Sequence, residues 1–186
     1  MIRLETERLT IRNFCPGDWQ TLQEIAIQAE ASEYWAYDYA WPTTAEEIKK
    51  ITNDFTGNDG FIAVCLKSTG AFIGFISLKQ SDRDDCVEYD LGYRFHSAYH
   101  GQGYATESCR ALLDYAFDDL TADQVTSGTA AANLPSRRLQ QRLGFRKTGE
   151  DIVSFRTTPE GEPIRFVGYS FAITREEWQE RKRRGN

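Results

Sequence analysis

The sequence has little of what metal centres and disulfide-stabilised folds require. Its 186 residues include only two histidines and four cysteines, and no two cysteines form a CxxC pair. A structural zinc site needs about four nitrogen or sulfur ligands at compact spacing, so we expect no metal. A chain of this length also builds a core without disulfides. We therefore predict buried free thiols in a cytoplasmic protein at Cys15, Cys65, Cys86 and Cys109.

The sequence also lacks long apolar runs and an excess of basic residues. Charged side chains interrupt the N-terminal segment MIRLETERLTIRNF, and no stretch reaches the roughly 18 apolar residues of a membrane span. We expect neither a signal peptide nor a membrane contact. The net charge of −6, from 22 basic and 28 acidic residues, argues against a general nucleic-acid-binding protein. We interpret the basic run at 181–184 as a solvated helix end, with contact to RNA as the less favoured alternative.

Several familiar catalytic and nucleotide-binding motifs are missing. The chain contains no GxxxxGK[ST], no HExxH and no GxSxG, which removes support for a P-loop, a metalloprotease and a serine hydrolase. Gly101 and Gly103 begin a GxGxxG pattern, but Thr106 stands where the third glycine would be. The Rossmann fingerprint is therefore incomplete.

The hydrophobic pattern predicts a single mixed-sheet α+β domain over residues 1–186. Alternating or continuous apolar runs predict strands over 8–14, 61–67, 71–78, 87–95, 124–130, from 145, and 164–173. Helical spacing predicts helices over 18–29, 44–55, 105–116, 134–143 and from 175. A series of antiparallel strands followed by a strand–helix–strand passage favours this fold class.

A glycine-containing loop joins the clearest predicted strand, 87–95, to the helix that follows it. Gly101, Gln102 and Gly103 stand directly before that helix. Free backbone N–H groups and the helix dipole favour an anion at such a place, and a pyrophosphate is the natural ligand. A tight strand-to-helix turn explains the same glycines equally well, so this motif alone leaves both interpretations open.

A second motif distinguishes between them. The segment NLPSRRLQQRLGF, from Asn133 to Phe145, follows a strand about 30 residues after the glycines. The two motifs together resemble the GNAT superfamily of acetyl-CoA-dependent N-acetyltransferases, which combines an R/Q-x-x-G-x-G/A loop with a later N-x-x-S/A and GF. His100 takes the R/Q position here. The segments LETERLTIR at 4–12 and YSFAI at 169–173 resemble the ribosomal-protein N-terminal acetyltransferase (RimJ/RimL-type) branch.

The resemblance, which covers nearly the whole chain, implies a fold and a cofactor site. The fold is a twisted, mostly antiparallel sheet flanked by helices, in which two central strands splay apart. Carried onto this chain, those strands are 86–95 and 124–130, and the pantetheine arm of acetyl-CoA lies between them. The cofactor-binding residues that the resemblance implies are Tyr93, Arg94 and Phe95 on the strand, Gly101, Gln102, Gly103, Tyr104 and Ala105 at the pyrophosphate, and Asn133 and Ser136 near the splay.

The implied reaction is direct transfer of an acetyl group from a thioester to a primary amine. Glu88 and Asp90 share one face of their strand and are the candidate bases, although a solvated polar face explains them as well. Many relatives carry a tyrosine seven residues after the asparagine, where this chain has Gln140. Ser136 is therefore the candidate on the thiol side, and a purely structural role in the first helical turn is its alternative.

Five aromatic residues cluster in the segment 34–41, between the first two predicted helices. Aromatic rings around a carboxylate suit a cationic amine, so the predicted acceptor pocket consists of Trp35, Tyr37, Asp38 and Trp41. A hydrophobic plug over the sheet is the alternative. The acceptor stays open between a protein N-terminus and a small amine such as a polyamine, amino acid or antibiotic. A non-catalytic acyl-CoA-binding module is the alternative from another class, and a homodimer also stays open.

Overall fold

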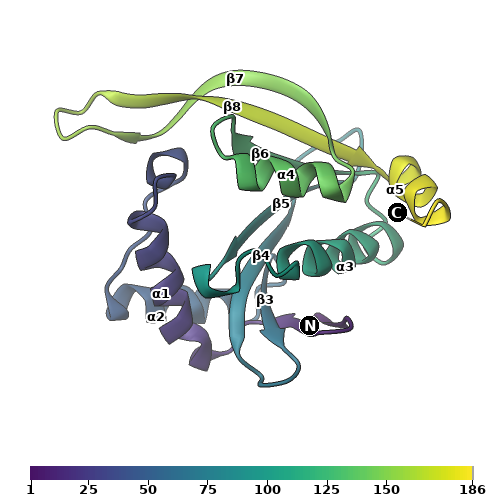
Figure 1. The fold of residues 1–186 in the computed structure, drawn as a ribbon, viewed down its shortest axis with the longest axis horizontal. Coiled ribbons are helices and arrows are strands. Elements are labelled where there is room, and N and C mark those ends of the chain that lie inside the picture. The colour runs from purple at the N-terminus through teal and green to yellow at the C-terminus, as the bar shows by residue number, and fades with distance from the viewer. Residues whose placement is uncertain (186) are drawn as a thin grey trace.

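The computed structural model describes residues 1–185 and is built on one eight-stranded sheet (Figure 1). The strand order across the sheet is β1-β2-β3-β4-β5-β6-β8-β7. Every neighbouring pair is antiparallel except β5 and β6, which are parallel. The predicted mixed, mostly antiparallel sheet is therefore confirmed. The strands are β1 (Arg3–Glu5), β2 (Leu9–Asn13), β3 (Phe61–Leu66), β4 (Phe72–Gln80), β5 (Glu88–Phe95), β6 (Gln124–Ala130), β7 (Arg146–Thr157) and β8 (Pro163–Thr174).

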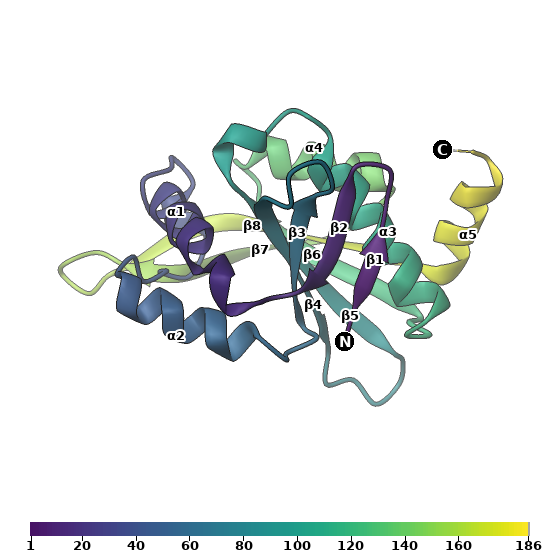
Figure 2. The ribbon, with the colours of Figure 1, turned by 90° about the horizontal axis from the view of Figure 1, so that it is seen from below.

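Helices cover both faces of the sheet (Figure 2). Each face has its own hydrophobic core, and successive residues of the central strands point alternately into one core and the other. In β3, Ile62 and Val64 join the core under α3, α4 and α5, whereas Ala63 and Cys65 join the core under α1 and α2. This alternation is the period of two that strand geometry imposes. The helices are α1 (Trp19–Glu30), α2 (Ala45–Phe55), α3 (Tyr104–Asp118), α4 (Leu134–Leu143) and α5 (Arg175–Arg183).

Local sequence signals set several element ends. The Thr44 side chain accepts a hydrogen bond from the Glu47 backbone and begins α2. Gly144 ends α4 in the left-handed conformation, with φ 91°. The sequence does not predict β1, because a three-residue strand is too short to show a period. The strands predicted from 145 and over 164–173 correspond to β7 and β8, which pair as a long hairpin of two 12-residue strands.

The expectation of four buried cysteines is only half right. Cys65 and Cys109 are buried, but Cys15 is exposed and Cys86 is partly exposed. Cys15 and Cys86 lie in the segments that lead into α1 and β5, and such connecting segments usually run along the protein surface. All four cysteines are free thiols. Among residues 1–185, no helix combines the length and the apolar character that crossing a membrane demands.

Candidate active site

β5 and β6, the parallel pair in the described part of the chain, separate after three paired residues. Glu88, Tyr89 and Asp90 of β5 pair with Gln124–Thr126 of β6. β5 then continues to Phe95 and β6 to Ala130, with no further pairing between them in the described chain. Apart from the Leu91 oxygen, which accepts from Ser127 Oγ at 2.8 Å, the backbone of β5 beyond Asp90 is not hydrogen-bonded to β6 and can bind another extended chain. This is the splay that the resemblance implied for these two strands.

A large cavity runs through this splay, with a volume of about 2090 Å³. Typical small-molecule sites occupy roughly 300–1,000 Å³, so this cavity has room for two substrates. It extends from the glycine loop at one end to the aromatic segment 34–41 at the other. Most of the predicted site residues line it; Gln102 and Glu88 do not.

The glycine loop gives the beginning of α3 an open backbone. Gly101 and Gly103 both have positive φ, 72° and 84°, and Gly103 precedes the helix with no side-chain cap. The first N–H groups of α3 are therefore available for an anion, which fits a pyrophosphate. Gln102 instead turns its side chain back, and its Nε2 donates to the Ala98 backbone oxygen at 3.0 Å.

Sequence analysis missed the residue that braces this loop. Arg8 donates from Nη1 to the Gln102 backbone oxygen at 3.0 Å and from Nε to Glu107 Oε2 at 2.7 Å. Its guanidinium also lies over the Tyr104 ring, 4.5 Å from the centroid. Arg8 lines the cavity and places its guanidinium, which is paired with Glu107, beside the proposed phosphate position. The segment 4–12 carried the resemblance, but nothing local placed Arg8 next to a loop more than 90 residues away.

The structure separates the two candidate bases. Asp90 lines the cavity at the last paired position of the splay, with Lys79 opposite it on β4. The Asp90 side chain is exposed to the cavity, yet desolvation by the surrounding protein raises its pKa; the charge of Lys79 opposes this shift and that of Glu88 adds to it. Glu88 is buried and lies outside the cavity, where it accepts a hydrogen bond from Gln124 Nε2. The geometry therefore brings only Asp90 into the site.

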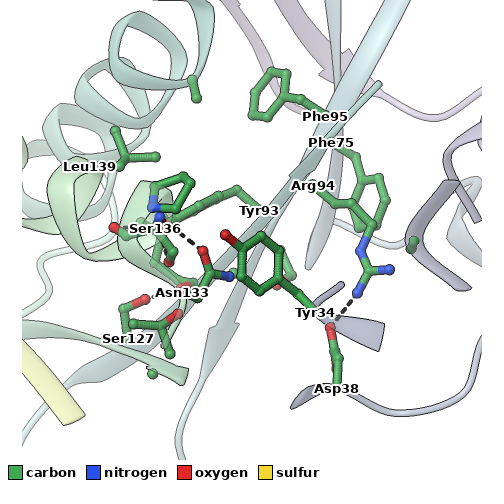
Figure 3. Close-up of a pocket in the computed structure, with 18 of the residues that line it drawn as sticks. Tyr34, Asp38, Phe75, Tyr93, Arg94, Phe95, Ser127, Asn133, Ser136 and Leu139 are labelled. Atoms are coloured by element: carbon green, nitrogen blue, oxygen red, sulfur yellow. Dashed lines mark hydrogen bonds and ion pairs between the residues drawn. The ribbon is translucent and has the colours of Figure 1, made fainter. Parts of the chain in front are cut away.

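Ser136 contacts the Tyr93 side chain of β5, and Asn133 contacts Ser136 in turn (Figure 3). Asn133 Oδ1 accepts from the Ser136 backbone N–H at 3.2 Å and so caps α4, which leaves the Asn133 Nδ2 group for a ligand. Ser136 Oγ lies 2.8 Å from the Tyr93 hydroxyl. Sequence analysis assigned Tyr93 to the cofactor through its backbone and did not predict this side-chain contact.

All four predicted acceptor residues line the cavity, together with Tyr34. Asp38 is not a free carboxylate, however, because it forms an ion pair with Arg94 (Figure 3). Arg94 also lies over the Trp41 ring, 5.2 Å from the centroid. The expected cage of aromatic rings around an open carboxylate is thus a wall in which an arginine already neutralises the acid.

The β7–β8 hairpin closes this wall from the far end of the chain. Tyr37 packs on Phe166 and Tyr39 on Phe155, with ring centroids 4.9 and 4.7 Å apart. Arg156 donates to both carboxylate oxygens of Glu30, at 2.6 and 2.7 Å. This hydrogen bonding by Arg156 lowers the pKa of Glu30 and keeps the pair ionised. Sequence analysis missed these contacts, because they join residues more than 110 positions apart.

Comparison with known proteins places the chain in a family. The model of the acetyltransferase (GNAT) domain matches residues 8–146. The uncharacterized N-acetyltransferase YnaD of Bacillus subtilis is 27% identical over 95% of this chain and 99% of its own. YdaF of the same organism, which carries the provisional name of a ribosomal N-acetyltransferase, is 29% identical over 77% of this chain and 81% of its own.

A solved GNAT-family acetyltransferase from Bacillus anthracis has the same fold. It superposes with a TM-score of 0.80 and covers 94% of this chain and 99% of its own, at 24% identity. Three observations point to the same family: the shared fold, the matched domain, and the splayed strands with their glycine loop. This chain is a member of the GNAT family of acetyltransferases.

Proposed function

We propose that this enzyme transfers the acetyl group of acetyl-CoA to a single primary amine, with the free N-terminus of a polypeptide as the first candidate. The observation that carries the proposal is the splay: one continuous cavity joins the glycine loop to the aromatic wall through the gap between β5 and β6. A donor bound along the gap and an amine bound at the wall meet beside Asp90.

The described residues fit acetyl-CoA as the donor. The backbone of residues 92–95, unpaired toward β6, offers strand-like hydrogen bonds to an amide-containing arm. The N–H groups after Gly103 and the charge of Arg8 suit a pyrophosphate. When bound, acetyl-CoA supplies an acyl group already activated as a thioester. Holding the two reactants in place contributes effective molarities of about 10⁵ M or more.

Two side chains have the chemistry that acyl transfer needs. Asp90 accepts the proton that the amine loses, directly or through water, and its raised pKa makes it a better base than an ordinary aspartate. Ser136 presents its hydroxyl on the opposite side of the strand, where it donates a hydrogen bond to the departing sulfur. These roles favour an enzyme over a non-catalytic acyl-CoA-binding module.

The charges of the acceptor wall favour one amine over a polycation. Asp38, which lines the wall, is already paired with Arg94, and Glu30 behind it is paired with Arg156. A polyamine needs several carboxylates to balance its charges, whereas a peptide N-terminus brings one amine and an otherwise neutral backbone. Asp90, beside the splay, and Asp151, on β7, are the carboxylates left to this part of the cavity, and Asp90 is the one placed to receive the amine.

The test follows free thiol release from acetyl-CoA with a panel of acceptors: short peptides with free N-termini, amino acids, a polyamine and an aminoglycoside. We expect the highest kcat/KM with peptides, and no release when their N-termini are blocked. Preference for the polyamine would contradict the proposed acceptor class. Tight coenzyme A binding without release from any amine would establish the binding module instead.

A further inference from the structure

A buried polar network lies behind Ser136, and its centre is Gln140 on α4. The Gln140 side chain is fully buried. Its Nε2 lies 2.6 Å from Ser127 Oγ and 3.3 Å from the Tyr93 hydroxyl. Ser127 belongs to β6 and Tyr93 to β5, so the network connects both edges of the splay to the helix that carries Ser136.

The orientation of the Gln140 amide follows from the single proton that Ser127 can donate. Ser127 Oγ donates to the backbone oxygen of Leu91 at 2.8 Å, just beyond the last paired residues of the two strands. If the Gln140 oxygen faced Ser127, two oxygens would compete for one hydroxyl proton. The amide nitrogen therefore faces this side and donates its two hydrogens to Ser127 and Tyr93, while Oε1 points away and is buried with no hydrogen-bond partner within the described chain.

This donor sets the direction of the hydrogen bond between Tyr93 and Ser136. The Tyr93 oxygen accepts from Gln140, and within residues 1–185 its own proton reaches Ser136 Oγ at 2.8 Å or the Ser136 backbone oxygen at 3.4 Å. The shorter contact is the better hydrogen bond, and a phenol is a stronger acid than an alcohol. Tyr93 therefore donates to Ser136 Oγ, which leaves the Ser136 proton free to point into the cavity.

We propose that Tyr93 and Gln140 are positioning residues that hold the Ser136 hydroxyl as a hydrogen-bond donor toward the thioester sulfur. The inference rests on the proposed function and deepens it on the thiol side. Gln140 occupies the helix position where many relatives carry a tyrosine, and here it orients a tyrosine from a strand. Burial also raises the pKa of Tyr93 above that of an ordinary tyrosine, so its hydroxyl stays protonated even in alkaline buffer.

The electron and proton balance of this step is simple. As the carbon–sulfur bond breaks, its electron pair stays on the sulfur, while the acyl carbon keeps its new bond to nitrogen. The amine proton passes to Asp90 or water. The Ser136 proton stays on Ser136 as a hydrogen bond to the sulfur, which takes its own proton from water after release.

A double-mutant cycle tests the kinetic consequence. A hydrogen bond to a charged group corresponds to about a 10-fold to 100-fold effect, so we expect Tyr93→Phe and Ser136→Ala each to lower kcat by that factor with little change in the KM for acetyl-CoA. The double variant should be no slower than Ser136→Ala alone, because Tyr93 acts only through Ser136. Tyr89→Phe makes the same change on the same strand outside the cavity and should keep the wild-type kcat.

A binding experiment without any acceptor gives an independent readout. The thiolate absorbance of bound coenzyme A, measured against pH, reports the pKa of its thiol. A Ser136 donor should lower this pKa by about one unit or more relative to Ser136→Ala, and Tyr93→Phe should remove most of that difference. Ser136→Thr, which keeps a hydroxyl, should retain the lowered value.

The outcomes separate this inference from the function on which it rests. Full kcat in Tyr93→Phe, losses that multiply in the double variant, or an unchanged thiol pKa would overturn the positioning role. If the thiol pKa depends on Tyr93 and Ser136 while no amine is acetylated, the positioning role stands and the proposed function fails.

Discussion

The cofactor side and the acceptor side of the cavity are built in different ways. The cofactor side is largely local: the glycine loop leads directly into α3 and Asn133 caps the helix that carries Ser136, with Arg8 as a long-range brace. The acceptor side is assembled from distant segments, with Arg156 and Phe166 of the β7–β8 hairpin closing over residues 30–41. A local site keeps its shape through backbone geometry, whereas the assembled wall depends on a few long-range contacts. Substitutions on the two sides should therefore change different kinetic parameters.

The largest expected effect is a loss of acetyl-CoA affinity on substitution of Gly103. A valine there must adopt a left-handed φ beside Arg8 Nη2, 3.3 Å from the added Cβ, and would distort the N–H groups offered to the pyrophosphate. Isothermal titration should show acetyl-CoA affinity lowered by about 100-fold, the equivalent of one or two charge-assisted hydrogen bonds. Gly70→Val is the matched control, because Gly70 has a similar φ of 73° in the β3–β4 turn with open space around it. Equal affinity in both variants would remove the pyrophosphate from this loop.

The next effect distinguishes Asp90 from Glu88. We expect Asp90→Asn to lower kcat by about 100-fold, as for loss of a general base, with acetyl-CoA binding intact. Glu88→Gln should instead keep kcat near the wild-type value and lower Tm, because Glu88 lies buried against Gln124 outside the cavity. Steady-state kinetics and thermal unfolding measure the two responses. The reverse pattern would assign the base to Glu88.

A smaller effect is expected on the acceptor side alone. Arg156→Met removes both hydrogen bonds to Glu30 and should loosen the wall, raising the KM for the amine by about 10-fold while acetyl-CoA affinity stays unchanged. Arg146→Met breaks an exposed ion pair with Glu177 at the other end of the same strand and serves as the control. A parallel loss of acetyl-CoA affinity in Arg156→Met would show that the two sides are not independent.

The smallest expected effect is a shift along the pH axis. The charge of Lys79 lowers the pKa of Asp90, so Lys79→Met should raise that pKa and move the acidic limb of the kcat profile to higher pH. Asp90 is active as a base only when ionised, which fixes the direction of this shift. Lys49→Met, an exposed change on α2 over the Trp19 ring, should leave the limb in place. A limb that does not move, or that moves to lower pH, would contradict a titrating Asp90.

The same difference between local and assembled structure explains how much the sequence predicts. Short-range rules predict three features that the structure contains: the helix cap at Thr44, the helix end at Gly144, and the strand indicated by alternating apolar and polar residues over 87–95. The splayed strands and the glycine loop could be located in the sequence because the motifs of the family lie in these strands or directly beside them. Arg8 on the loop and Arg156 on Glu30 could not, because the sheet brings together residues whose spacing carries no period.

The Tyr93 side chain shows the limit within the site itself. Alternation placed it correctly on the strand, but its hydroxyl contact with Ser136 depends on how closely α4 packs on β5. Gln140 was recognised only as a missing tyrosine. Its burial and its two donated hydrogen bonds depend on the three-dimensional packing of three elements.

Mass analysis of a single peptide tests the central claim most directly. The peptide carries a free N-terminus and one lysine, and a second copy has its N-terminus blocked. The account predicts one acetyl group on the free N-terminus for each coenzyme A thiol released, and no reaction of the blocked copy. Thiol release without peptide acetylation, or equal acetylation of the blocked copy, would contradict it.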